Sequence, residues 1–193
     1  MKPVLMIHEI VYDLFQLPLQ DYILTFDDGL FSQYHFSPLL KKIDTRKILF
    51  VSGKYVCRSN QRRQTYPAFY YSTTPEDARK SFDKSSGFVD HHYMTISEIN
   101  YMRGLGFEIG GHGYNHIRDY SKKIEKRVEE MTDDVEKMIG WMESMFGITP
   151  KSYCFPFNKE PDLLREILKR KGIEEFFGAE RIDVNELLNT VSN

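Results

Sequence analysis

The chain has few cysteines, no long hydrophobic run and almost no net charge, and each absence excludes a class of protein. Two cysteines, Cys57 and Cys154, are too few for a disulfide framework. No apolar stretch approaches the roughly 20 residues of a membrane span. His8 and Glu9 interrupt the short apolar run near the start, so no signal peptide is predicted. A formal net charge of −2 does not suggest nucleic acid or an anionic membrane surface as a partner. We therefore expect a cytoplasmic protein, and the sequence leaves its oligomeric state open.

The composition that remains is typical of one globular domain. The 193 residues are 41% hydrophobic and 28% charged, which is enough for a single domain with a full core. Aromatic residues make up 14% of the chain; they mostly serve packing, although sugars also bind on aromatic faces. We expect one domain over residues 1–193. Residues 58–90 are predicted to form an insertion, either a lid over a site or a variable surface excursion.

Short apolar runs alternate with helical patterns along the chain. The predicted strands cover residues 4–7, 22–26, 48–51, 107–109, 152–155 and 174–177. The predicted helices cover residues 30–42 (weakly, broken by Pro38), 97–103 (capped by Thr95 or Ser97), 121–146, 162–171 and a last one from 185. This alternation predicts an α/β fold with a parallel sheet and right-handed crossovers. In the longest helix, apolar residues from Ile124 and Val128 onward recur every three or four positions and are expected to face the core.

Two neighbouring carboxylates, Asp27 and Asp28, follow the apolar run at residues 22–26 and precede Gly29. Side chains alternate along a strand, so both acids can face one way only where the strand ends. In α/β proteins, the carboxyl edge of the sheet is where sites form. Taken alone, the pattern is equally typical of an Asp-rich turn.

A pair of histidines, His112 and His116, follows the predicted strand at residues 107–109, which Gly110 and Gly111 are expected to break. Four residues make about one helical turn, so both imidazoles can face one point. Such a pair alone more often consists of surface or capping histidines. Together with one carboxylate it forms a three-ligand set that leaves a position open on a divalent metal ion.

These segments carry a family resemblance. Residues 25–29 (TFDDG), 112–116 (HGYNH) and 154–157 (CFPF) resemble, in this order, motifs of the polysaccharide deacetylase family, the NodB-homology enzymes of carbohydrate esterase family 4. The resemblance covers about residues 4–157, with a weaker echo at 181–183. It implies a distorted, incomplete (β/α) barrel and a metal-dependent hydrolase that removes N-acetyl groups from an amino sugar or glycan precursor in surface-polysaccharide biosynthesis.

The resemblance also implies roles for individual residues. By position, Asp28, His112 and His116 would bind a divalent metal ion, with zinc expected, and Asp27 would be the general base. The wall of the substrate site would be Phe155, Pro156 and Phe157. Asn115 would be a substrate-site residue or a turn residue.

Two family features are missing from the chain. The third motif usually opens with an arginine that orients the base, but Cys154 stands there and cannot form a charge-assisted bond; Arg181 is the expected replacement. The family's general acid is a histidine near the C-terminus, and no histidine follows His116. His8 is the best replacement by placement, and His91–His92 come next. Loss of a general acid costs about 10²- to 10⁴-fold in rate.

Other functions remain open at this stage. The chain could be a catalytically weak or inactive relative that binds a glycan or a partner protein. It could also deacylate an amide that is not a sugar. The favoured partner is an N-acetylated sugar or glycan substrate.

Overall fold

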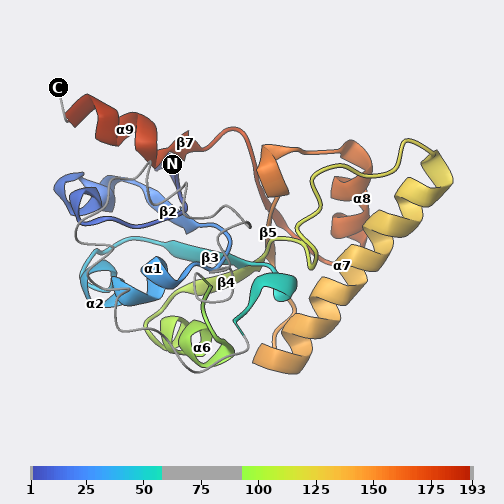
Figure 1. Cartoon of the computed structure of the whole chain (residues 1–193), viewed down its shortest axis with the longest axis horizontal. Coiled ribbons are helices and arrows are strands. Elements are labelled where there is room, and N and C mark those ends of the chain that lie inside the picture. The colour runs from blue at the N-terminus through green and yellow to red at the C-terminus, as the bar shows by residue number, and fades with distance from the viewer. Residues whose placement is uncertain (1, 58–92, 192–193) are drawn as a thin grey trace.

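A computed structural model describes residues 2–57 and 93–191 (Figure 1). The predicted insertion at 58–90 and the pair His91–His92 lie outside the described residues. No helix in the described part is long and apolar enough to cross a membrane.

All pairings between the seven strands are parallel, and the sheet has the order β6-β5-β4-β3-β2-β1-β7. The strands are β1 (Val4–Ile7), β2 (Ile23–Phe26), β3 (Lys47–Val51), β4 (Glu108–Gly111), β5 (Ser152–Cys154), β6 (Glu175–Phe177) and β7 (Ile182–Asp183). The sheet curls into a half-barrel with helices around it (Figure 1). The predicted incomplete (β/α) barrel is therefore confirmed.

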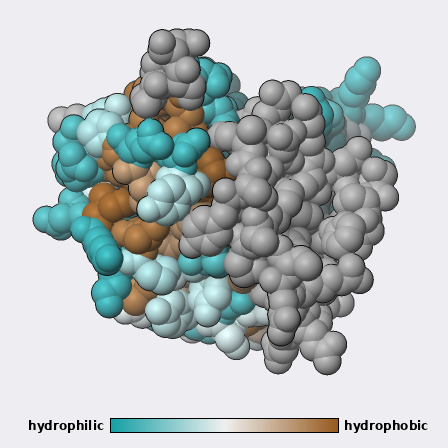
Figure 2. All heavy atoms as spheres, turned by 60° about the vertical axis from the view of Figure 1, so that its left-hand side comes forward, coloured by the Kyte–Doolittle hydropathy of each residue, from teal (hydrophilic) through white to brown (hydrophobic). Residues whose placement is uncertain are grey.

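Helices surround this sheet on several sides. The α-helices are α1 (Phe31–His35), α2 (Ser37–Leu40), α6 (Ile96–Gly104), α7 (Ile124–Phe146), α8 (Asp162–Arg170) and α9 (Val184–Val191). The short 3₁₀ helices are η1 (Tyr12–Gln16), η2 (Leu19–Asp21), η3 (Gly53–Tyr55) and η5 (Pro156–Asn158). Helix α7 packs against α8 and η3, and α9 packs against β1, β7 and η1. Figure 2 brings forward the side that carries α1, α2 and α9, where hydrophobic side chains show between polar ones.

The strand register brings distant parts of the sequence to one edge of the sheet. Ile7 pairs with Phe26, and Val51 pairs with Gly111; all four are the last residues of their strands. Because the strands are parallel, the residues that follow them meet at the same carboxyl edge. These residues are His8, Asp27, Ser52 and His112.

Helix boundaries follow local capping chemistry. Helix α6 begins after Thr95, which accepts the Glu98 N–H on its Oγ1 while the Glu98 carboxylate accepts the Thr95 N–H. This reciprocal pair is a capping box and selects Thr95 over Ser97 as the cap. The weak helix at 30–42 is broken as expected, but the break lies at Phe36. Pro38 sits in the first turn of α2, where its missing N–H costs nothing.

Two predictions are wrong: the strand break at Gly110 and Gly111, and the buried apolar stripe along the whole of α7. Packing explains both. Strand β4 continues through Gly110 and Gly111 instead of breaking there. A Cβ at Gly110 would lie 2.5 Å from the Phe50 ring, and one at Gly111 would lie 2.3 Å from the Met138 sulfur. The glycines therefore permit close approach of neighbouring side chains.

The apolar stripe of α7 is buried only in part. Ile124 is 56% exposed and Val128 is 39% exposed, whereas Met131, Val135 and Met138 are buried. In Figure 1 the N-terminal end of α7 lies away from the sheet. The first turns therefore have no sheet surface to pack against, although their spacing matches that of the buried turns.

Candidate active site

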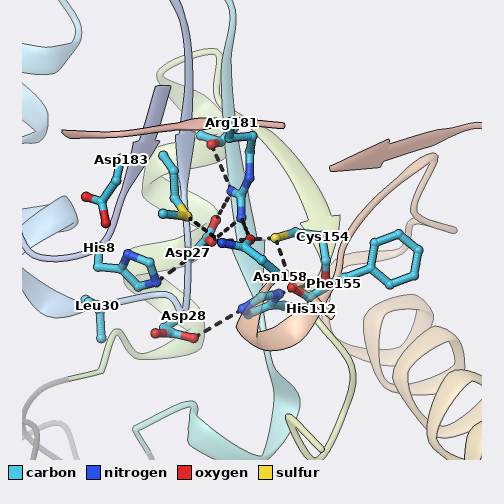
Figure 3. A network of polar contacts seen from close by, with 12 residues as sticks. His8, Asp27, Asp28, Leu30, His112, Cys154, Phe155, Asn158, Arg181 and Asp183 are labelled. Carbon is cyan, nitrogen blue, oxygen red and sulfur yellow. Dashed lines mark hydrogen bonds and ion pairs between the residues drawn. The ribbon is translucent and has the colours of Figure 1, made fainter. Parts of the chain in front are cut away.

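A buried ion pair joins the end of β2 to the residue before β7. Asp27 is 2% exposed, and the side chain of Arg181 is fully buried. The Arg181 Nη1 donates to Asp27 Oδ1 at 2.8 Å and Nη2 donates to Oδ2 at 2.8 Å, a bidentate arrangement seen in Figure 3. The guanidinium also donates to Thr25 Oγ1, Gly178 O and Asn158 Oδ1, so it is held on all sides.

The electrostatics of this pair keep the carboxylate ionised. Burial alone would raise the pKa of Asp27, but the charge and hydrogen bonds of Arg181 outweigh burial and lower it. The Cys154 thiol lies against the same carboxylate, with Sγ 3.5 Å from Oδ2. Burial and the Asp27 charge raise the pKa of Cys154 to about 11, so the thiol stays protonated and donates its hydrogen. Arg181, from the segment between β6 and β7, thus supplies the cation that Cys154 cannot supply.

Asp28, His112 and His116 converge beside this pair. Asp28 Oδ1 lies 3.3 Å from His112 Nε2 and 3.1 Å from His116 Nε2, and the two Nε2 atoms are 3.2 Å apart. Burial alone would raise the pKa of Asp28, but its contacts with the two imidazoles lower it well below the usual range. His112 is also oriented from behind, because its Nδ1 lies 2.8 Å from the Cys154 carbonyl oxygen.

The geometry of these three atoms fits a divalent cation. Metal bonds of about 2.0–2.2 Å place neighbouring ligand atoms roughly 3 to 3.5 Å apart. The three edges of the Asp28–His112–His116 triangle, 3.1 to 3.3 Å, fall within that range. Asp27, His112 and Cys154 form a second close group. It does not fit a cation, because Arg181 already neutralises Asp27 and the thiol is protonated.

The loop at residues 112–116, here called the histidine loop, is held by Asp134 from α7. His112 and His116 do not lie on a helical turn as expected, because Gly113 and His116 adopt left-handed φ values of 69° and 54°. The Asp134 carboxylate accepts the Tyr114 N–H at 3.1 Å and the Asn115 N–H at 2.8 Å. It also accepts the Asn115 side-chain amide at 2.8 Å. Asn115 is therefore a turn residue in this structure, and its side chain is tied to α7.

Asp134 was missed by the sequence analysis, although a signal existed. It is 3% exposed and lies on the buried face of α7 beside Met131, Val135 and Met138. An acid within an apolar stripe needs donors, and two backbone N–H groups and one side-chain amide supply them here. A Cβ on Gly113 would lie 2.8 Å from Asp134 Oδ2, so glycine is required for this contact.

Two acid–base groups stand at the end of β1. The side chain of His8 is 35% exposed, and its Nε2 lies 3.9 Å from Asp27 Oδ2 (Figure 3). Its neighbour Glu9 was not predicted as a site residue, although an acid two residues after a strand end can lie at the site edge. Burial raises the pKa of Glu9 to about 8; a contact with Ser32 opposes this shift, and the charge of Asp28 adds to it.

The expected substrate wall is only partly exposed. Phe155 and Pro156 are buried, and the Phe155 ring packs against Tyr153, so these two side chains support the site from behind instead of lining it. Phe157 is 48% exposed, and its ring centroid lies 4.6 Å from that of His116. The ring centroid of Tyr55 lies 5.8 Å from that of His116. Tyr55 was not among the predicted site residues.

Comparisons with known proteins identify the family and the fold. A family model described as polysaccharide deacetylase matches residues 18–176. No curated protein sequence matches significantly. Among solved structures, IcaB from Ammonifex degensii is similar with a TM-score of 0.62 and 16% identity, covering 99% of this chain and 97% of that one.

Two further solved structures share the fold. The Streptococcus pyogenes deacetylase PplD, in complex with acetate, has a TM-score of 0.59 and 13% identity, covering 97% of this chain and 96% of that one. A CE4 family pseudoenzyme from Bacillus anthracis has a TM-score of 0.50 and 15% identity, covering 91% of this chain and 43% of that one. Since the family model spans most of the sequence and the fold agrees, the chain belongs to the polysaccharide deacetylase family.

Proposed function

We propose that this protein is a metal-dependent hydrolase that removes the N-acetyl group from an amino sugar of a surface-polysaccharide precursor. The observation that carries the proposal is the convergence of Asp28 Oδ1, His112 Nε2 and His116 Nε2 within 3.1 to 3.3 Å of one another, beside the buried Asp27 carboxylate. Two imidazoles and one carboxylate are a donor set suited to zinc, and three protein ligands leave room for water and substrate.

In this proposal Asp28, His112 and His116 hold the ion, and Asp27 handles the proton. When bound, a divalent ion would polarise the amide carbonyl and increase the acidity of the attacking water. Asp27 takes the proton from that water, because Arg181 keeps its carboxylate ionised and fixed. The same ion pair lowers the proton affinity of Asp27, so the proton is held only briefly.

The departing amine nitrogen needs a proton, so that acetate and a free amine are released. His8 is the proposed donor, because its Nε2 lies 3.9 Å from Asp27 Oδ2, at the exposed side of the pair. One small rotation or one bridging water would connect the two groups. Phe157 offers an exposed aromatic face next to His116 for the sugar ring.

An inactive, glycan-binding relative is the second candidate. It is favoured by the absence of any histidine after His116. The Arg181–Asp27 pair weakens the other reason for this candidate, since Cys154 no longer leaves the base without a cation. Zn²⁺ binding and acetate release, measured together, separate the two candidates.

Removal of metal tests the ligand set. Chelator-treated protein is expected to lose acetate release from N-acetylglucosamine oligomers and to regain it with Zn²⁺. Asp28→Asn should weaken Zn²⁺ binding by roughly 100-fold or more, since it removes a ligand charge. Asp44→Asn, which removes an exposed acid, is the control. Unchanged Zn²⁺ binding in Asp28→Asn would refute the ligand set. Zn²⁺ binding without acetate release would favour the inactive relative.

The role of Asp27 as the base is tested in a variant that also lacks its partner Arg181. Asp27→Asn alone leaves a buried guanidinium unpaired and is expected to destabilise the fold by about 3–5 kcal/mol. The double variant Asp27→Asn/Arg181→Met removes both charges, so it should fold and bind Zn²⁺. Its kcat should fall by about 10²- to 10⁴-fold. Wild-type kcat in this double variant would exclude Asp27 as the base.

The acid is tested by comparing adjacent residues. His8→Ala should lower kcat by about 10²- to 10⁴-fold while Zn²⁺ binding persists. Glu9→Gln, which preserves shape and hydrogen-bonding capacity, should leave kcat within about threefold of wild type. If Glu9→Gln lowers kcat by this factor and His8→Ala does not, the Glu9 carboxyl is the proton donor and His8 is not.

The role of Asp134 is tested with its exposed neighbour as control. Asp134→Ala removes the acceptor of three hydrogen bonds that shape the histidine loop. Groups that orient metal ligands typically affect affinity by 10- to 100-fold, so Zn²⁺ binding should weaken by about that factor. Asp133→Ala should bind Zn²⁺ like wild type. Equal affinities in the two variants, both shown to be folded by circular dichroism, would contradict this role.

A further inference from the structure

A pocket with several basic side chains in its lining lies beside the histidine loop. It has a volume of about 180 Å³. Ile117 and Arg118, which directly follow His116, form one wall, and Pro156, which precedes Phe157, forms another. The Phe157 ring contacts the His116 ring, so the pocket adjoins the proposed sugar-binding face.

The charges in this pocket do not cancel. Its lining includes three cations, Arg118, Arg127 and Lys159, and one carboxylate, Asp119. Lys159 pairs with Asp119 at 2.6 Å. Arg127 donates only to backbone carbonyls, those of Ser121 and Lys122, and Arg118 has no ion pair among the described residues. Within residues 2–57 and 93–191, two guanidinium groups thus have no carboxylate partner, in a chain whose net charge is −2.

Arg118 links the pocket to the site. Its guanidinium carbon lies 5.2 Å from the centre of the Phe157 ring, a cation–π contact that positions the side chain without using its hydrogen-bond donors. A guanidinium held in this way presents a planar fork of N–H groups, which matches a carboxylate or a phosphate. One residue pair thus offers an aromatic face for a sugar and a cation for an acidic substituent.

We propose that the pocket formed by Arg118, Arg127 and Lys159 binds an anionic group, a carboxylate or phosphate, carried by the acetylated substrate. This inference rests on the proposed function and narrows it, because it specifies an acidic glycan as the preferred substrate. The anionic group binds while the N-acetyl group of the same molecule sits at Asp28, His112 and His116.

The test compares matched oligosaccharides of equal length. One is a neutral N-acetylglucosamine oligomer, one carries lactyl ether carboxylates on alternate sugars, and one carries a phosphate ester. Dissociation constants are measured by calorimetry and KM by acetate release, both with the Zn²⁺-loaded full chain. We expect at least one acidic oligomer to bind about 10-fold tighter than the neutral one. Which acidic oligomer is preferred identifies the substituent.

Variants then assign the preference to the pocket. Arg118→Gln should weaken acidic binding about 10-fold and change neutral binding less than twofold. Arg118→Lys should recover only part of the preference, because it keeps the charge and loses the fork. Arg170→Gln, an exposed charge at the far end of α8, is the matched control. The preference should also shrink as ionic strength rises from about 0.05 to 0.5 M.

The outcomes separate this inference from the proposed function. Equal affinity for acidic and neutral oligomers, or an equal loss for both in Arg118→Gln, would overturn the anion pocket even if acetate is released. Acidic preference that depends on Arg118, without acetate release from any oligomer, would support the pocket and refute the hydrolase.

Discussion

A carboxylate and a guanidinium that are both removed from water hold the site together. Asp27 follows β2 and Arg181 precedes β7, so their two hydrogen bonds of 2.8 Å connect residues 154 positions apart. An unpaired charge in such a place would be strongly unfavourable, and breaking one buried partner typically costs about 3–5 kcal/mol. Asp27 can therefore stay ionised at the sheet edge only because β7 pairs with β1 and brings Arg181 to it.

This pairing also explains how the chain can depart from the family pattern. A cysteine at the third motif cannot balance the charge of Asp27, but it can donate a weak hydrogen bond to it from a protonated thiol. Its backbone carbonyl orients His112 at the same time. Cys154 thus contacts both halves of the site, while the positive charge comes from Arg181. The site requires a cation against Asp27, and in this chain Arg181 supplies it.

The histidine loop likewise depends on residues that are not metal ligands. Its two imidazoles face one point although the backbone is not helical, because Asp134 binds two successive N–H groups and Gly113 leaves room for that contact. The neighbouring pocket is lined by Ile117 and Pro156, the sequence neighbours of His116 and Phe157. It also holds two guanidinium groups that have no carboxylate partner in the described part of the chain. Catalytic geometry and proposed substrate selection therefore depend on the same short loop, supported from α7.

The sequence alone was sufficient for the alternating fold and for bringing the residues that follow β2 and β4 to one edge, because strand ends of a parallel sheet meet there whatever lies between them. The choice of Asp28, His112 and His116 as one ligand set came from the resemblance to the family motifs. The sequence could not place Asp134 or Glu9, or show that Phe155 is buried, since those properties depend on which side chains pack against them. Spacing predicted a buried Ile124, and residue type predicted a strand break at Gly110; the structure shows neither. Only the tertiary structure decided these points, because periodicity records which face of an element a residue occupies, whereas burial depends on whether another element covers that face.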